Sequence, residues 1–227
     1  FKVIWSKSKQ CYVVVSEMAK NKTGKKKIVV ASILAALAMQ TASVIDVAAA
    51  VGDQPSAAIA NGSVTSGKTN GLAIGNFASS GSNQSIAIGY YSVATATEAD
   101  PALPATAVGA GANATGQSTV ALGLLAQATS GSTTALGAKS VASEDAAVAV
   151  GYGTKATGNY ASALGADATA SNNDATAFGH GTVASGGSST ALGSRAKAGG
   201  TAGVGIGMLA NATNQYGVAI GGESSSS

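Results

Sequence analysis

A pattern of three residues recurs eleven times in this 227-residue chain: a small residue, a bulky apolar residue and a glycine. Nine of the ten intervals between successive copies are fourteen residues long. A fixed short period indicates stacked structural units, each of which contacts only its neighbours. The glycines that close the copies are Gly75, Gly89, Gly109, Gly123, Gly137, Gly151, Gly165, Gly179, Gly193, Gly207 and Gly221.

The spacing inside each repeat predicts strands. With each glycine numbered as position 0, small residues occupy most of positions +3, +5, +10 and +12, and a bulky apolar residue occupies +13. A spacing of two is typical of β-strands, whereas an amphipathic helix places apolar residues three and four apart. Gly, Asn and Ser near positions 0 and +6 to +8 predict two turns. Each repeat is therefore predicted to be one coil of a β-solenoid.

The size of the side chains predicts their orientation. A flattened coil of fourteen residues has room inside only for Ala, Ser, Thr and Gly, so the bulky +13 residues must point outward together with +11. Stacking coils at ~4.8 Å turns them into an outer apolar stripe on the order of 50 Å long, which predicts burial against partner chains. This +13 stripe comprises Ile74, Ile88, Val108, Leu122, Leu136, Val150, Leu164, Phe178, Leu192, Ile206 and Ile220.

Two irregularities interrupt the period. The interval between Gly89 and Gly109 is twenty residues and includes the segment ATEADPALP, residues 96–104, with two of the three prolines. We expect this insertion to bulge from one coil and hypothesise that it is a local recognition loop. Before the first regular repeat, Ala58, Ile59 and Ala60 predict a degenerate twelfth copy.

The first fifty residues have a different composition, with eight of the thirteen Lys and Arg residues and the only Cys and Trp. A basic cluster precedes an apolar run at residues 28–39, and small residues follow at 48–50, which is typical of a secretory signal with cleavage predicted after Ala50. The apolar run is too short to span a membrane, which takes about 20 residues.

Removal of this leader would reverse the net charge. Residues 51–227 contain five basic and eight acidic residues, for a net charge of −3, and no Cys. This charge disfavours binding to nucleic acid or to an anionic membrane surface, and the absence of Cys excludes disulfides.

The residues give no support for catalysis. His180 is the only histidine, and no second His or Cys is present in residues 51–227 to build a triad or a metal site. Glu144 and Asp145 fall in a predicted turn, where solvated carboxylates are expected. The segment GVGIG, residues 203–207, keeps the register of the repeat and lacks the strand–helix context of a nucleotide loop. We predict no enzymatic activity, no cofactor and no metal.

Two parts of the chain resemble one family. Residues 1–27, FKVIWSKSKQCYVVVSEMAKNKTGKKK, resemble the extended signal-peptide region of Gram-negative type V secreted proteins. The repeats, for example GQSTVALGLLAQATSGSTTALG at residues 116–137, resemble the head repeats of YadA-like trimeric autotransporter adhesins. The resemblance implies an all-β, left-handed parallel β-roll of about eleven coils, assembled as a homotrimer about a central axis.

The resemblance also implies a location and a function. It implies export to the bacterial surface, anchoring in the outer membrane through C-terminal membrane strands absent from this chain, and binding to host extracellular matrix, host cells or other bacteria. The extended signal region is expected at residues 1–27, and the hydrophobic core of the signal with its cleavage region at 28–50. A lead-in or degenerate coil is expected at 51–70 and the head repeats at 71–222. Residues 223–227 are expected to start a linker to a neck or stalk.

Other functions stay open. The main alternative is a non-adhesive structural or protective solenoid. An ice-binding solenoid would need aligned Thr columns, but Thr at +6 recurs in only some coils, and a disordered coat would not keep so strict a register.

Outward turn residues with long side chains are the candidates for an adhesive surface, because Tyr and Arg commonly anchor interfaces. Ordinary solvated surface is the alternative interpretation for each of them. The candidates are Tyr90, Tyr91, Lys139, Tyr152, Lys155, Tyr160, Arg195 and Tyr216.

Overall fold

The computed structural model of the chain describes residues 2–6, 11–15, 57–59, 63–64, 70–96 and 103–226. Contacts between residues divide the chain into two units, of which the first is Phe1–Ala42. In this unit β1 (Lys2–Ser6) and β2 (Cys11–Val15) form an antiparallel pair with Trp5 opposite Tyr12. The predicted hydrophobic core of the signal, the cleavage site after Ala50 and residues 97–102 of the insertion lie outside the described residues.

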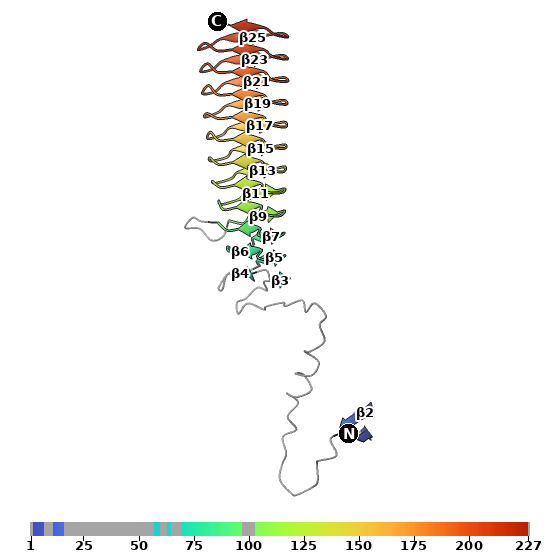
Figure 1. Cartoon of the computed structure of the whole chain (residues 1–227). Coiled ribbons are helices and arrows are strands. Elements are labelled where there is room, and N and C mark those ends of the chain that lie inside the picture. Colours follow the sequence, from blue (N-terminus) through green and yellow to red (C-terminus); the bar gives the residue numbers. More distant parts are fainter. Residues whose placement is uncertain are drawn as a thin grey trace. The chain divides into compact units, whose positions relative to one another are not determined.

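The second unit, Ser43–Ser227, contains a β-solenoid whose coils stack along one axis (Figure 1). Two parallel sheets run along it, each with twelve strands. The +13 sheet comprises β3 (Ala57–Ile59), β5 (Leu72–Ile74), β7 (Ile86–Ile88), β9 (Ala105–Val108), β11 (Thr119–Leu122), β13 (Thr134–Leu136), β15 (Val148–Val150), β17 (Ser162–Leu164), β19 (Thr176–Phe178), β21 (Thr190–Leu192), β23 (Val204–Ile206) and β25 (Val218–Ile220).

The second sheet consists of shorter strands that cover positions +4 and +5 of each coil, and we name it the +4 sheet. It comprises β4 (Ser63–Val64), β6 (Ser79–Ser80), β8 (Val93–Ala94), β10 (Asn113–Ala114), β12 (Gln127–Ala128), β14 (Val141–Ala142), β16 (Lys155–Ala156), β18 (Thr169–Ala170), β20 (Val183–Ala184), β22 (Lys197–Ala198), β24 (Asn211–Ala212) and β26 (Ser225–Ser226). The predicted parallel β-roll of about eleven fourteen-residue coils is confirmed.

The register between coils follows the sequence repeat. Each strand pairs with the equivalent strand of the next coil, so that Leu136 of β13 lies opposite Val150 of β15. The twenty-residue interval between Gly89 and Gly109 does not change the register of the +13 sheet, because Ile88 of β7 lies opposite Val108 of β9. The degenerate copy is also confirmed as part of the solenoid, since β3 joins the +13 sheet with Ile59 opposite Ile74.

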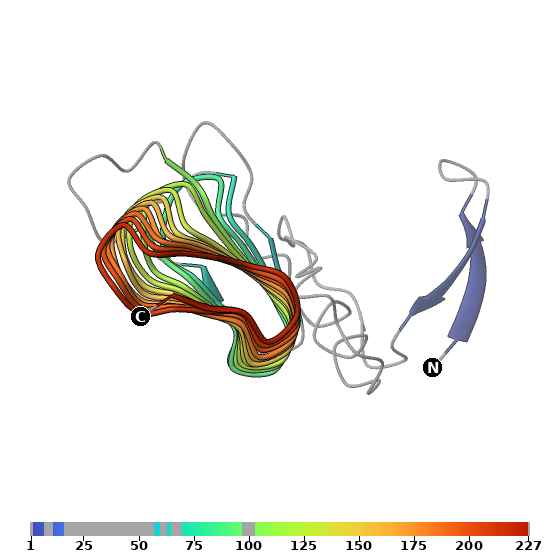
Figure 2. The ribbon, with the colours of Figure 1, turned by 90° about the horizontal axis from the view of Figure 1, so that it is seen from above.

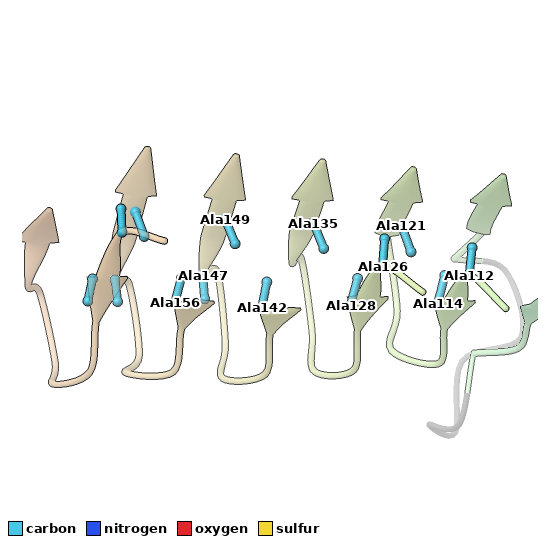
Figure 3. Packing of buried hydrophobic residues seen from close by; sticks show 14 of the residues in the cluster. Ala112, Ala114, Ala121, Ala126, Ala128, Ala135, Ala142, Ala147, Ala149 and Ala156 are labelled. Atoms are coloured by element: carbon cyan, nitrogen blue, oxygen red, sulfur yellow. The ribbon is translucent and has the colours of Figure 1, made fainter. Parts of the chain in front are cut away.

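Small side chains fill the interior of the coils. Viewed along the axis, each coil is a flattened loop (Figure 2), and the alanines of both sheets project into the narrow space between them (Figure 3). Ala135 and Ala149 of the +13 sheet and Ala142 and Ala156 of the +4 sheet are completely buried. The inward positions predicted from side-chain size are confirmed by this burial.

The glycine at position 0 is required by two features of the turn. Gly193 has a φ of +124°, a backbone conformation that strains any residue with a Cβ atom. A Cβ atom built there would lie 2.6 Å from the carbonyl oxygen of Gly207 in the next coil. Close stacking of the coils therefore explains why the repeated triplet ends in glycine.

Hydroxyl groups at the inward position +3 are paired with backbone carbonyls of the position-0 glycines. The Thr154 hydroxyl donates to the Gly165 carbonyl at 2.6 Å, and the Thr182 hydroxyl donates to the Gly193 carbonyl at 2.7 Å. A buried hydroxyl costs free energy unless it forms a hydrogen bond. The interior therefore accepts Ser and Thr at position +3 as readily as Ala.

Enlarging an inward side chain should destabilise the solenoid. In the variant Ala149→Leu, three added carbon atoms meet the opposite sheet, and overpacking of this kind costs about 1–3 kcal/mol. We expect a thermal unfolding midpoint lower by several degrees in circular dichroism. The matched control is Val148→Leu, at the outward neighbouring position of β15, which is only half-buried. Equal midpoints for the two variants would contradict the inward assignment.

Candidate functional site

The +13 stripe lies on the outer face of the +13 sheet, as predicted. None of its eleven side chains is buried in the single chain, and Leu136 and Phe178 are 38% and 49% exposed. The residues at position +11 lie on the same outer face and include Val120 and Val218, which are both exposed. A continuous column of aliphatic side chains is therefore open on one face.

The outer face of the +4 sheet has a different composition. Its outward residues include Gln127, Lys155 and Lys197, all exposed, and its apolar members are the three valines Val93, Val141 and Val183. A polar outer face needs no cover from a partner, whereas a long apolar one does. The contrast makes the +13 sheet, and not the +4 sheet, the candidate face for association.

The eight candidate adhesive residues occupy three different places. All are exposed. Seven lie in turns as predicted, but Lys155 does not, because position +4 belongs to strand β16. The first turn, at positions +1 and +2, holds Tyr90, Tyr91, Lys139, Tyr152 and Arg195, and the second turn, at position +9, holds Tyr160 and Tyr216.

Two of the candidates belong to an aromatic cluster with Phe77, which the sequence analysis did not select. The Phe77 and Tyr91 rings stack with their centroids 4.7 Å apart, and the Tyr90 and Tyr91 rings meet edge to face at 4.5 Å. All three side chains are more than half exposed. The signal was present in the sequence, because Phe77 and Tyr91 both occupy position +2, and equivalent positions of adjacent coils stack at about the strand spacing.

Another pair of candidates is brought together in the first turn. The Lys139 ammonium nitrogen lies 5.7 Å from the centroid of the Tyr152 ring, within the range of a cation–π interaction. The two residues lie in adjacent coils, at positions +2 and +1. Arg195 lies in the same turn, three coils beyond Tyr152. The first-turn candidates therefore form separate groups and not one continuous site.

Exposed apolar residues also occur in the first turn. Leu124 and Leu125 form one pair and Met208 and Leu209 another, each with more than 40% of the side chain exposed. The sequence analysis missed both pairs because it considered only aromatic and charged residues as candidates. Bulky residues at consecutive positions +1 and +2 are the signal that identifies them.

The groups considered for catalysis lie at the surface. His180 is exposed in the first turn. The Asp145 carboxylate accepts hydrogen bonds from the backbone N–H of Gly131 at 3.1 Å and from the Ser130 hydroxyl, so it supports the second turn. Within the described part of the chain, no group of three or more His, Cys, Asp or Glu side chains could hold a metal ion. The same residues include no helix with the length and apolarity needed to cross a membrane.

Comparison with known families identifies both parts of the chain. The model of the Extended Signal Peptide of Type V secretion system matches residues 1–45. The model of the YadA head domain repeat matches residues 66–98, 104–126, 128–154, 156–182 and 184–208, which is more than half of the chain. The chain belongs to the YadA-like trimeric autotransporter adhesins. A comparison with curated proteins gave no match.

The matches to the YadA head repeat, which contains two copies of the coil, follow the solenoid in segments of about two coils each. The gap between residues 98 and 104 falls in the insertion, and the match ends at residue 208, although β24 and β25 continue the coils in register. Heads of YadA-like adhesins are trimeric β-rolls that bind external targets, and the family is in general not enzymatic. The extended signal peptide of type V secretion indicates export to the cell surface.

Proposed function

We propose that this chain is the head of a bacterial surface adhesin that acts as a homotrimer at the outer membrane. It binds host extracellular matrix proteins, host cells or neighbouring bacteria through its turns. The observation that carries the proposal is the match of the YadA head repeat to the coils of the solenoid. The proposal includes no enzymatic role, since the family is in general not enzymatic.

The +13 stripe supports the trimeric assembly. Interiors filled with Ala bury little apolar area per residue, which at ~25 cal/mol per Å² offsets only part of the ordering entropy of the backbone. Packing three +13 stripes about one axis removes the largest apolar face from water. A closed ring of three chains also covers every copy of the +13 stripe, so that none stays open for uncontrolled growth.

The two turns support the adhesive role. They flank the +13 sheet in every coil, so they stay accessible when the outer face of that sheet is covered. Exposed Tyr and Arg side chains such as Tyr90 and Arg195 have the reach and the amphipathic character of interface anchors. A trimer presents each turn three times, so contacts that are weak individually add up by avidity.

The proposal is tested first by the solution mass of residues 51–227, measured by light scattering with and without a trimeric coiled coil fused after Gly222. We expect three times the chain mass, and saturable binding of the trimer to immobilised collagen, fibronectin or laminin or to layers of host cells. A folded monomer in both forms would contradict the trimer. A trimer that binds none of these surfaces and does not aggregate bacteria would favour the structural solenoid.

A further inference from the structure

A hollow of about 490 Å³ opens at the second turn, over four successive coils. It is separate from the +13 stripe and from the aromatic cluster of the first turn. Its volume lies within the range of small-molecule binding sites. Its lining residues are Gly116, Gln117, Thr129, Ser130, Gly131, Ser132, Asp145, Ala146 and Tyr160.

The +8 and +9 positions that line the hollow are mostly occupied by small residues until the fourth coil. Gly116 and Gly131 have no side chains, and Ser132 and Ala146 at position +9 have small ones. The next residue in the +9 column is Tyr160, which is 65% exposed. Its ring therefore bounds the hollow on one side.

The floor of the hollow is a hydrogen-bonded ladder of backbone groups. The N–H of Ser132 donates to the Gln117 carbonyl at 2.8 Å, and the N–H of Ala146 donates to the Gly131 carbonyl at 2.9 Å. The N–H of Tyr160 continues the ladder to the Asp145 carbonyl at 2.8 Å. A site held by such a ladder loses little conformational freedom when a ligand binds.

Asp145 supplies a fixed acceptor on the rim. Its Oδ1 atom is held by the Gly131 N–H and the Ser130 hydroxyl, and its own N–H donates to Asn159 Oδ1 at 3.2 Å. The second carboxylate oxygen, Oδ2, makes no hydrogen bond to the described residues. An exposed, oriented carboxylate oxygen accepts hydrogen bonds from ligand hydroxyls, and such charge-assisted bonds are stronger than neutral ones.

The chemistry of the lining selects the class of ligand. Sites for apolar ligands are mostly apolar, but this lining consists of Gly, Ser, Thr, Gln, Asp and Ala with one aromatic ring. It contains one carboxylate and no Lys or Arg, which disfavours phosphate, sulfate and other anions. Hydroxyl and amide groups around an exposed Tyr ring suit a ligand with many hydroxyls and one apolar C–H face.

We propose that this hollow is a binding site for a neutral saccharide. One pyranose ring stacks on the Tyr160 ring, its hydroxyls donate to Asp145 Oδ2, and the Ser132 hydroxyl and the Gln117 amide contact the rest of the sugar. The proposal rests on the proposed adhesive function, since it names the ligand class of one surface of the head. In a homotrimer the site occurs three times, which favours clustered glycans over free sugars.

The test applies the purified chain to a printed array of neutral, sialylated and sulfated oligosaccharides. We expect binding to neutral oligosaccharides, reduced about tenfold or more by Tyr160→Ala and by Asp145→Asn. Tyr160→Phe should retain binding, because the ring is kept. The matched control is Asp174→Asn, which makes the same change as Asp145→Asn at an exposed carboxylate of a second turn that does not line the hollow.

A third variant tests the hollow itself. A Cβ atom at Gly131 would lie 3.3 Å from the Asp145 Oδ1 atom, a contact that a shift of a few tenths of an ångström relieves, so Gly131→Leu should fold and fill the hollow. We expect this variant to lose saccharide binding with an unchanged circular dichroism spectrum. Retained binding would overturn the site.

Other results would also overturn the proposal. These are binding of the wild-type chain to sialylated or sulfated glycans alone, no binding to any glycan, or an equal loss in Asp174→Asn. If the wild-type chain and Tyr160→Ala adhere equally to host cells while the array stays negative, the saccharide site is wrong and the adhesive function stands. If neither adheres to matrix, cells or glycans, the adhesive function fails as well.

Discussion

Replacing Gly193 by alanine is expected to cause a large loss of stability, because the turn between two stacked coils has no space for a methyl group. Gly193 has a φ of +124°, and backbone strain in such a region costs about 1–3 kcal/mol for a residue with a Cβ atom. The new methyl group would also lie 2.6 Å from the Gly207 carbonyl oxygen and 2.8 Å from its carbonyl carbon. Because neither backbone atom can move without separating two coils, the cost exceeds that of strain alone.

The measurement is thermal unfolding by circular dichroism together with amide hydrogen exchange. We expect a midpoint about 10 °C lower for Gly193→Ala, and lost protection in the coils on either side, because solenoid coils are stabilised by their neighbours. Gly199→Ala is the control in the same coil. Its Cβ atom would meet only the Ser185 hydroxyl oxygen at 3.8 Å, so its midpoint should be unchanged or slightly higher. Equal effects of the two substitutions would contradict the stacking explanation.

The fold could be predicted from the sequence because the interior of the coil constrains one residue at a time. Only a small side chain fits where Ala149 lies, and only glycine fits where Gly193 lies. The fourteen-residue period of the coils therefore appears in the sequence as a period of residue types. The same constraint made the degenerate copy at Ile59 and the register across the insertion predictable.

The outer surface could be predicted only in part. The outward direction of the +13 stripe follows from the size of its side chains, but turn positions accept many residue types, so no period marks the binding residues among them. Tyr160 was selected for its side chain, while Gly131 and Ala146 were not, since a hollow is made by residues that lack bulk. Phe77 was missed because its contact with Tyr91 depends on stacking between coils.

Charging the +13 stripe is expected to dissociate the trimer. Leu164 and Phe178 lie opposite each other in β17 and β19, and their side chains are 39% and 49% exposed in the single chain. With Leu164→Asp and Phe178→Asp combined, a trimer would enclose six carboxylates at its axis. Burying unpaired charges costs several kcal/mol for each ion, more than the apolar contacts of two coils return. Light scattering should therefore give one third of the wild-type mass.

The matched control places the same charges on the opposite face of the solenoid, in the coils that begin at Gly165 and Gly179. Thr169 and Val183 lie opposite each other in β18 and β20, half-buried on the outer face of the +4 sheet. Thr169→Asp with Val183→Asp creates the same repulsion between neighbouring strands but should leave the trimer intact, so it separates assembly from strand pairing. A trimer that survives charges in the +13 stripe, or a control that dissociates, would show that the chains associate through another face. Loss of cell adhesion in the stripe variant alone would show in addition that binding depends on presenting three copies of each turn.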